Sequence, residues 1–441
     1  MSTEAPGVFA VEQGKRASLR ADFSWMLVGN AIYAGGQFAT LMLLAKMVRP
    51  ELVGQYALGL AIVYPVMMLT NMQLRAVMTS GARQQTHFGD YLSLRLLTTS
   101  LAIVIIFAIT QVLGYRGDLT AVVLMVGVGY GIETISDVYY ARLQLHDKMA
   151  EISKSLIARA VLSVLGLAIA TYISGSVLWG IAGVVLARAI VFIGYDISES
   201  THGLGRQSNW FSRTEELTPR FNLKVQGELL WLSLPLGIVV LLTSLNSNAP
   251  SYFIQHALGD RDLGIFSAMG FMISVGNMAV VSLGQSAFTR LARSYADGNL
   301  IAFGSLLGKL LAFGAMLGVS GMAVSKLAGR EILTIVFRPE YAERADLLPW
   351  FMAAGGVLFM AQFLGFGMTA AGYFKSQVVL NILANLSLFA ACYWFVARQG
   401  LLGAIIAMLI AAIVQLAGSA MVLVRSMRLH TQVCARNVET A

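Results

Sequence analysis

Residues 402–424 read LGAIIAMLIAAIVQLAGSAMVLV, a stretch without a single charged side chain. An α-helix rises about 1.5 Å per residue and the hydrocarbon core of a bilayer is about 30 Å thick, so roughly 20 apolar residues cross it once. Backbone groups inside lipid must find hydrogen-bond partners within the protein, and a helix provides them. The stretch is therefore predicted to be a transmembrane helix.

Comparable apolar runs recur along the whole chain. Of its 441 residues, 57% are hydrophobic and only 12% are charged, and the mean hydropathy is +0.71. The predicted fold class is an all-α integral membrane protein with about 12 transmembrane helices. The predicted spans are residues 23–47, 54–76, 94–114, 119–140, 155–174, 177–198, 228–248, 264–288, 301–325, 348–370, 377–397 and 402–424.

The rest of the composition excludes several classes of protein. The net charge of +8 comes from basic residues at span ends, so we expect no nucleic-acid partner. Two cysteines, Cys392 and Cys434, are not expected to form a disulfide framework or a metal site. No phosphate-binding loop occurs, so the chain is not expected to hydrolyse ATP. We expect no catalytic residues and no bound metal.

The charges between the apolar runs predict the topology. When successive connections are assigned to alternate sides, about 20 Lys and Arg fall on the side of the N-terminus and about 9 on the other side. Because cytoplasmic loops carry the excess of Lys and Arg, both termini are predicted to lie in the cytoplasm. Residues 326–346 are predicted to be a loop on the outer side, and its basic residues are an exception to the rule.

The two halves of the chain resemble each other weakly. Residues 50–57 read PELVGQYA and residues 260–267 read DRDLGIFS, each with glycine two positions before an aromatic residue. Both stretches join the first and second span of their half, and an even number of spans makes such repeats parallel. We therefore predict two pseudo-symmetric six-helix lobes, at 1–198 and 228–441, joined by a cytoplasmic linker at 199–227.

Four parts of the sequence carry a resemblance to one family. They are residues 50–57, residues 70–75 (TNMQLR) with 88–95 (FGDYLSLR), residues 133–140 (ETISDVYY), and residues 329–333 (GREIL) with 339–342 (PEYA). In this order and with this number of spans, the chain resembles the polysaccharide transporter family, the flippases for O-antigen, capsule and exopolysaccharide repeat units. That family belongs to the multidrug/oligosaccharidyl-lipid/polysaccharide exporter superfamily. The resemblance covers nearly the whole chain.

The resemblance implies a transporter of the bacterial inner membrane rather than an enzyme. The implied substrate is an undecaprenyl-diphosphate-linked oligosaccharide, moved from the inner to the outer leaflet by alternating access. The implied partners are this lipid-linked oligosaccharide, membrane lipid and other polysaccharide assembly proteins, and we expect a monomer. Two alternatives stay open: a cation-coupled drug or metabolite antiporter of the same superfamily, and a membrane polymerase of the same pathway. Short outer loops weigh against the polymerase.

Charged residues inside the spans are candidates for function, because each costs about 2.5–3.5 kcal/mol at the centre of a transmembrane helix. Arg188 lies near the middle of the span 177–198. Its planar guanidinium can hold a diphosphate or an acidic sugar by paired hydrogen bonds. The alternative interpretation is an interhelical ion pair, for instance with Glu133.

Two acids in the fourth predicted span are candidates for ion coupling. Glu133 and Asp137 are four residues apart, so they share one helix face. We predict coupling by H⁺ or Na⁺ through this face, with Arg188 or Arg159 as the partner of Glu133 in the empty state, and no other cofactor. For Asp137, a solvated position at the membrane interface is an equally good interpretation.

Further polar residues of the first half complete the predicted substrate cavity. Arginines at cytoplasmic span ends can form a basic vestibule, and deep amides suit sugar hydroxyls. The alternatives are anchoring by the positive-inside rule and interhelical hydrogen bonds of about 0.6 kcal/mol each. These candidates are Arg75, Arg95, Arg142, Arg159, Asn30 and Gln37.

Overall fold

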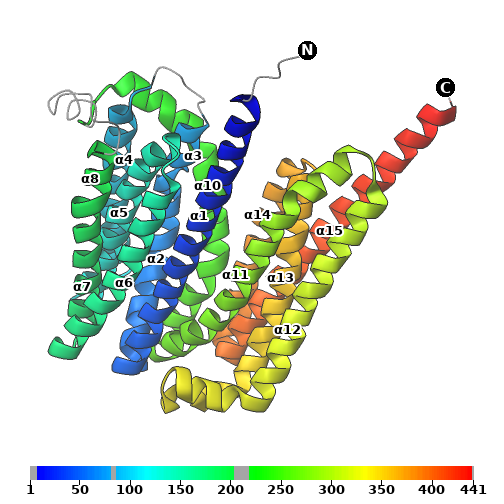
Figure 1. The fold of residues 1–441 in the computed structure, drawn as a ribbon. Helices are drawn as coiled ribbons and strands as arrows, with labels where there is room; N and C mark the ends of the chain where they lie inside the picture. The colour runs from blue at the N-terminus through cyan, green and yellow to red at the C-terminus, as the bar shows by residue number, and fades with distance from the viewer. Residues whose placement is uncertain (1–6, 81–85, 203–217, 440–441) are drawn as a thin grey trace. The chain divides into compact units, whose positions relative to one another are not determined.

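The computed structural model describes the backbone of most of the chain (Figure 1). Within the described residues, 12 helices are long and apolar enough to cross a membrane, which confirms the predicted all-α transmembrane fold. The middle of the predicted linker, 203–217, lies outside the described residues. The described backbone covers residues 7–80, 86–202 and 218–439, and the described side chains cover residues 24–80, 86–201 and 218–428.

The first of two compact units comprises Met1–Val48 and Ile62–Val240. It holds the end of α2 and the beginning of α10, whose other parts belong to the second unit. A π-helix, η1, interrupts the sixth span. The helices of this unit are α1 (Gly7–Met47), α2 (Pro50–Asn71), α3 (Leu74–Thr79), α4 (Phe88–Val112), α5 (Asp118–Leu145), α6 (Met149–Ser174), α7 (Val177–Val191), η1 (Phe192–Asp196), α8 (Ile197–His202) and α10 (Leu223–Leu258).

The second unit comprises Arg49–Ala61 and Leu241–Ala441. In it, α12 packs on α13, and α15 packs on both α13 and α14. Its remaining helices are α11 (Asp260–Ala296), α12 (Leu300–Val336), the 3₁₀-helix η2 (Pro339–Leu347), α13 (Leu348–Ala370), α14 (Phe374–Gln399) and α15 (Leu401–Glu439).

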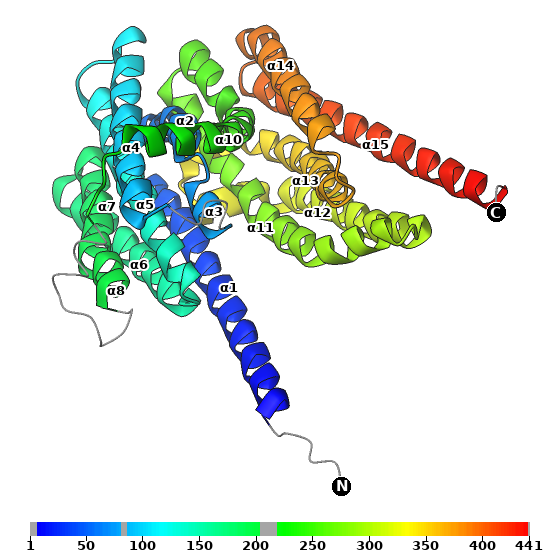
Figure 2. The ribbon, with the colours of Figure 1, turned by 90° about the horizontal axis from the view of Figure 1, so that it is seen from above.

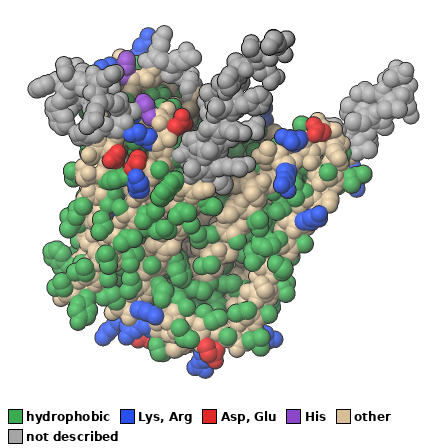
Figure 3. Space-filling model, in the orientation of Figure 1, with side chains coloured by type: hydrophobic (Ala, Val, Ile, Leu, Met, Phe, Trp, Pro, Cys, Tyr) green, Lys and Arg blue, Asp and Glu red, His purple; other side chains and the backbone are tan. Residues whose placement is uncertain are grey.

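The surface distribution of side chains suits a bilayer. Large apolar residues such as Val104, Leu186 and Leu386 are exposed near the middle of their helices. On the face drawn in Figure 3, hydrophobic side chains cover a broad zone, and the charged side chains gather at its two ends. In lipid these apolar side chains are in contact with acyl chains rather than with water.

The two stretches of the internal repeat contact each other in the second unit. A Cβ atom on Gly54 would lie 1.8 Å from the carbonyl oxygen of Asp260, and one on Gly264 would lie 2.1 Å from the carbonyl oxygen of Pro50. Gly54 and Gly264 hold equivalent positions in the repeat, as do Pro50 and Asp260. The contact is thus reciprocal, and both glycines are required because the backbones of α2 and α11 touch.

A proline frees one carbonyl in the middle of α2. Pro65 has no backbone N–H, so the carbonyl of Ala61, four residues earlier, has no intrahelical donor. The hydroxyl of Tyr252 on α10 donates to this carbonyl. A side chain of another helix therefore satisfies the group that proline leaves open, as membrane helices require.

The prediction of a loop at 326–346 is wrong, because nearly all of this segment is helical. The helix α12 continues to Val336 past a kink at Ala328, and η2 follows directly. Leu333, Phe337 and Tyr341 are almost completely buried. Their burial in the second unit holds the segment in a helical conformation in spite of its many charges.

The first turns of α10 run across the beginning of α4, as the view from above shows (Figure 2). The Arg220 amide donates to the Gly89 carbonyl at 3.0 Å. Ser93 donates to the Arg220 carbonyl at 2.6 Å and accepts from Gln226 at 2.7 Å. An apolar cluster includes Leu74 of α3 and Leu229 of α10. The short helix α3 is therefore held in place from the α10 side.

Candidate functional site

The first unit contains an open cavity of about 500 Å³. Five helices, α1, α2, α3, α5 and α6, contribute to its wall, and many of the side chains are polar. The polar and aromatic lining residues are Asn30, Tyr33, Tyr64, Asn71, Gln73, Arg75, Thr79, Tyr130, Glu133, Thr134, Asp137, Tyr140, Gln144 and Arg159.

A break between α2 and α3 brings Arg75 to this cavity. Met72 and Gln73 have φ angles of 48° and 52°, in the left-handed region that residues other than glycine rarely adopt. The chain turns there, and α3 begins at Leu74. Arg75 then donates from Nε to Gln144 at 3.0 Å and from Nη1 to Asp137 at 3.3 Å.

Arg95 stabilises the same break from behind the wall. Its side chain is completely buried. Nη1 donates to the carbonyl of Asn71 at 2.9 Å and lies 3.4 Å from the carbonyl of Thr70. These carbonyls are at the end of α2, where no further helical N–H is available, and a cation interacts favourably with that end of a helix dipole. Arg95 therefore binds backbone and does not line the cavity.

Glu133 accepts contacts from two other helices. The Tyr33 hydroxyl donates to it from α1, and Arg188 of α7 lies 3.2 Å away in an ion pair. The Arg188 guanidinium also lies over the Tyr130 ring, 4.6 Å from its centroid. Gln37 donates to the Tyr33 hydroxyl at 2.7 Å. The interhelical ion pair, one of the two interpretations of Arg188, is thus the observed arrangement.

A second ion pair is completely buried between α6 and η1. Arg159 donates to Asp196 at 2.8 Å, and the side-chain exposures of the two residues are 1% and 0%. Ser155 donates to the other carboxylate oxygen of Asp196, and the Tyr140 and Ser155 hydroxyls are 2.7 Å apart. The pair joins the π-helix to the cavity wall, because Arg159 and Tyr140 both line the cavity.

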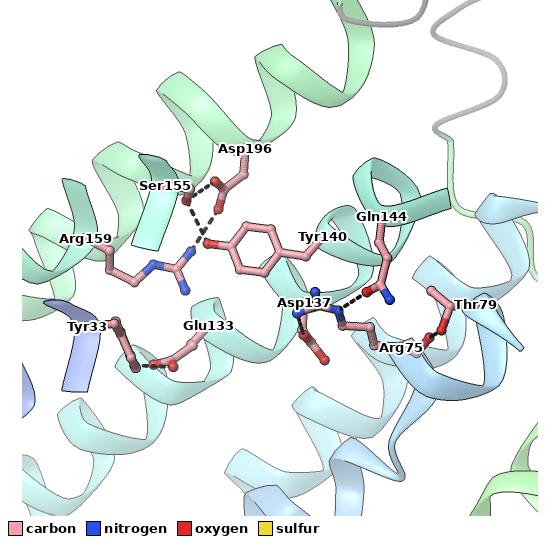
Figure 4. A network of polar contacts seen from close by, with 10 residues as sticks. All are labelled: Tyr33, Arg75, Thr79, Glu133, Asp137, Tyr140, Gln144, Ser155, Arg159 and Asp196. Carbon is pink, nitrogen blue, oxygen red and sulfur yellow. Dashed lines mark hydrogen bonds and ion pairs between the residues drawn. The ribbon is translucent and has the colours of Figure 1, made fainter. Parts of the chain in front are cut away.

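Tyr140 lies between the two arginines of the wall (Figure 4). The guanidinium carbon of Arg75 is 5.7 Å from the ring centroid, and that of Arg159 is 5.5 Å from it. The negative face of an aromatic ring attracts a cation at these distances. The Tyr140 ring therefore interacts with one guanidinium group from α3 and with another from α6.

The charges of the lining residues are balanced rather than basic. Arg75 and Arg159 are matched by Glu133 and Asp137. Each of these four side chains also has an oppositely charged partner. This differs from the basic vestibule that the sequence predicts, because the acids of α5 and η1 neutralise the arginines.

The structure separates the predicted site residues into two groups. The first group lines the cavity and consists of Asn30, Arg75, Glu133, Asp137 and Arg159; the second group is absent from the lining and consists of Gln37, Arg95, Arg142 and Arg188. Members of the second group contact neighbouring side chains or backbone instead. Arg142, for example, lies 5.2 Å from the centroid of the Phe88 ring.

Several residues of the site are absent from the sequence-based candidates. Asp196 is the main one, and its position inside the predicted span 177–198 was a usable signal. The tyrosines of the wall were missed because aromatic residues are common in apolar spans. On α5 a signal existed, since Tyr130, Glu133, Asp137, Tyr140 and Gln144 recur at spacings of three and four and share one face.

Comparison with known proteins agrees with this architecture. The capsular polysaccharide biosynthesis protein CapF of Staphylococcus aureus is 24% identical over 405 residues, which covers 90% of this chain and 96% of CapF. The structure of the lipid II flippase MurJ, in an inward closed conformation, aligns with a TM-score of 0.73 at 10% identity and covers 90% of this chain and 87% of its own.

An inward-facing multidrug resistance MATE transporter of the MOP superfamily aligns with a TM-score of 0.62 at 14% identity, over 93% of this chain and 95% of its own. At such identities these structures establish the fold. A family model described as polysaccharide biosynthesis protein matches residues 19–294, which is more than half of the chain. The chain therefore belongs to the polysaccharide biosynthesis protein family of multi-pass membrane proteins.

Proposed function

We propose that the protein is a flippase for undecaprenyl-diphosphate-linked oligosaccharide repeat units and moves them from the inner to the outer leaflet. The family and the fold it shares with the lipid II flippase support a transport role. The observation that carries the proposal is the pair of guanidinium groups, Arg75 and Arg159, in the wall of a cavity among transmembrane helices. Guanidinium forks match phosphate oxygens in geometry and charge.

The rest of the wall suits the oligosaccharide. Hydroxyl and amide groups of Tyr33, Tyr64, Asn30 and Gln144 can exchange hydrogen bonds with sugar hydroxyls, and the aromatic faces can pack on sugar rings. Alternating access requires that the two end states bind the substrate differently. Arg75 provides such a difference, since it must exchange the Asp137 carboxylate for a phosphate when the substrate binds.

Transport in proteoliposomes tests the proposal. A fluorescent lipid-linked oligosaccharide is incorporated, and its transfer between leaflets is followed by quenching with a membrane-impermeant reagent. The purified protein is expected to accelerate transfer, and Arg75→Ala is expected to remove most of the acceleration. Arg398→Ala is the matched control, since Arg398 stacks on Trp394 in the second unit. Equal rates with and without the protein would exclude the flippase.

We propose further that Glu133 couples transport to H⁺ or Na⁺. Its carboxylate lines the cavity and pairs with Arg188. It can therefore exchange Arg188 for a small cation. Glu133→Gln mimics the neutral form and is expected to stop transport while the substrate still binds. The measurement is the transport rate in vesicles with an imposed pH or Na⁺ gradient. Normal transport by Glu133→Gln, or a rate insensitive to both gradients, would contradict the coupling role.

The remaining parts of the proposal follow the predicted topology. We propose a monomer in the bacterial inner membrane with both termini in the cytoplasm, working beside other polysaccharide assembly proteins. A cation-coupled drug or metabolite antiporter is the second candidate, and the carboxylates of Glu133 and Asp137 in the wall favour it. Efflux of cationic dyes without any lipid transfer would identify the antiporter. Sugar transfer by the purified protein would identify a polymerase instead.

A further inference from the structure

Tyr140 has contacts at both ends of its side chain. Its hydroxyl is 2.7 Å from the Ser155 hydroxyl, and Ser155 donates to the buried Asp196. Its ring lies close to the guanidinium groups of both Arg75 and Arg159. The side chain is only 4% exposed, so its orientation is fixed by packing as well as by these polar contacts.

The two arginines reach the ring from helices that are far apart in sequence. Arg75 is on the short helix α3, and its position depends on the break after α2. Arg159 is on α6, and the pair with Asp196 fixes its position. Long arginine side chains have many rotamers, so a shared rigid support between them is the simplest way to hold the two charges at one spacing.

Arg159 also has unused hydrogen-bonding capacity. Its Nε and Nη1 atoms are buried and find no acceptor among the residues that the structure describes. A buried donor without an acceptor is costly, and an anionic oxygen would satisfy it once the Arg159 side chain turned toward the cavity. Arg159 lines that cavity. A ligand phosphate beside Arg159 would therefore complete the network.

From these contacts we propose that Tyr140 sets the selectivity of the cavity for a diphosphate over a monophosphate. The ring holds Arg75 and Arg159 on either side, so each guanidinium can bind one of two linked phosphates. A monophosphate engages one arginine and leaves the other on its carboxylate. The inference rests on the proposed function. It adds the residue by which the cavity would distinguish a prenyl lipid with a diphosphate from the same lipid with one phosphate.

Binding to the full-length protein in nanodiscs tests this role. The probes are a prenyl monophosphate and a prenyl diphosphate of the same chain length. The wild type is expected to bind the diphosphate about tenfold more tightly, a preference that one additional guanidinium–phosphate contact can supply. Tyr140→Leu removes the ring and is expected to bring the ratio of the two dissociation constants near one. Tyr140→Phe keeps the ring and should keep most of the ratio.

Tyr172→Leu is the matched control, because Tyr172 on α6 is 84% exposed and does not line the cavity. A purely structural role of Tyr140 would weaken both lipids equally and leave the ratio unchanged, and that result would overturn the proposal. No preference in the wild type would also overturn it. The flippase proposal is judged separately by lipid transfer: selective binding without transfer would leave the role of Tyr140 intact and remove only the transport function.

Discussion

The two ends of α2 are held in contrasting ways. At its beginning, in the second unit, Gly54 allows the backbones of α2 and α11 to touch, and the neighbouring Gln55 donates to Asp260 at 3.3 Å. At its end, in the first unit, the helix breaks at Met72 and Gln73, and Arg95 binds the carbonyls that the break exposes. Close backbone packing, with polar contacts beside it, positions the first end, whereas a buried arginine positions the second. The cavity therefore lies next to the end of α2 that a buried charge holds, and not next to the end that is closely packed.

Removal of one buried charge should have the largest effect. Arg159→Ala leaves Asp196 buried without its partner and is expected to lower the free energy of unfolding by about 3–5 kcal/mol. Thermal unfolding in detergent measures the loss. Lys154→Ala breaks an exposed pair with Glu151 and should change stability by at most about 1 kcal/mol. Equal losses in the two variants would show that the buried ion pair contributes no more to stability than the exposed one.

The glycine contact should be the next most sensitive feature. Gly54→Ala forces a methyl group onto the Asp260 carbonyl and is expected to cost about 1–3 kcal/mol. Gly264→Ala should cost a similar amount, since the contact is reciprocal. Gly308→Ala in α12 meets no atom within 4 Å and should gain up to about 1 kcal/mol from helix propensity. Tolerance of alanine at both contact positions would disprove the backbone contact.

The hydrogen bond in the middle of α2 should have a moderate effect. Tyr252→Phe leaves the Ala61 carbonyl without a donor and is expected to cost about 0.5–1.5 kcal/mol. Pro65→Ala restores an N–H four residues after Ala61, so Tyr252→Phe should cost less in that background. A double-mutant cycle on thermal unfolding measures the difference. Additive effects of the two substitutions would mean that the proline and the tyrosine act independently.

The smallest effect is expected at the exposed end of α11. Arg261 pairs with Glu343 at 2.8 Å and lies 3.8 Å from Glu51, and all three side chains are about half exposed. Arg261→Ala is expected to cost no more than about 1 kcal/mol, and the cost should fall at high salt because solvent screens exposed charges. Unfolding at low and high salt checks this. A large cost independent of salt would contradict the screened pair.

The fold was predictable because the bilayer imposes a simple rule on the sequence. Apolar runs of sufficient length, such as residues 402–424, must be helices, and the structure has them. The segment 326–346 was predicted wrongly because its charges were taken to indicate a loop. In the structure Leu333, Phe337 and Tyr341 are buried at regular intervals between those charges. These apolar residues are few, but they recur every four residues. This spacing was the sequence signal for a helix, and the surrounding charges drew attention away from it.

The site was predictable in part. Charged residues inside spans are rare enough to be noticed, and Arg75, Glu133, Asp137 and Arg159 do line one cavity. The pair of Glu133 with Arg188 was one of the sequence-based interpretations and is observed. The pair of Arg159 with Asp196 could not be predicted, because the two residues meet only when η1 packs on α6. The two roles offered for Arg188 also differed only in three-dimensional contacts. The sequence alone shows where a charged side chain is costly in the membrane. Residues on other helices decide whether that side chain forms an ion pair or faces the cavity.

The reciprocal contact of Gly54 and Gly264 has the form of an isologous interface within a single chain. In a symmetric homodimer the same patch faces itself, so every substitution occurs twice. Here the two copies of the patch are encoded separately, in residues 50–57 and 260–267. One repeat can therefore acquire buried ions without imposing them on the other. The chain keeps the geometry of a symmetric contact and is free to specialise one side of it.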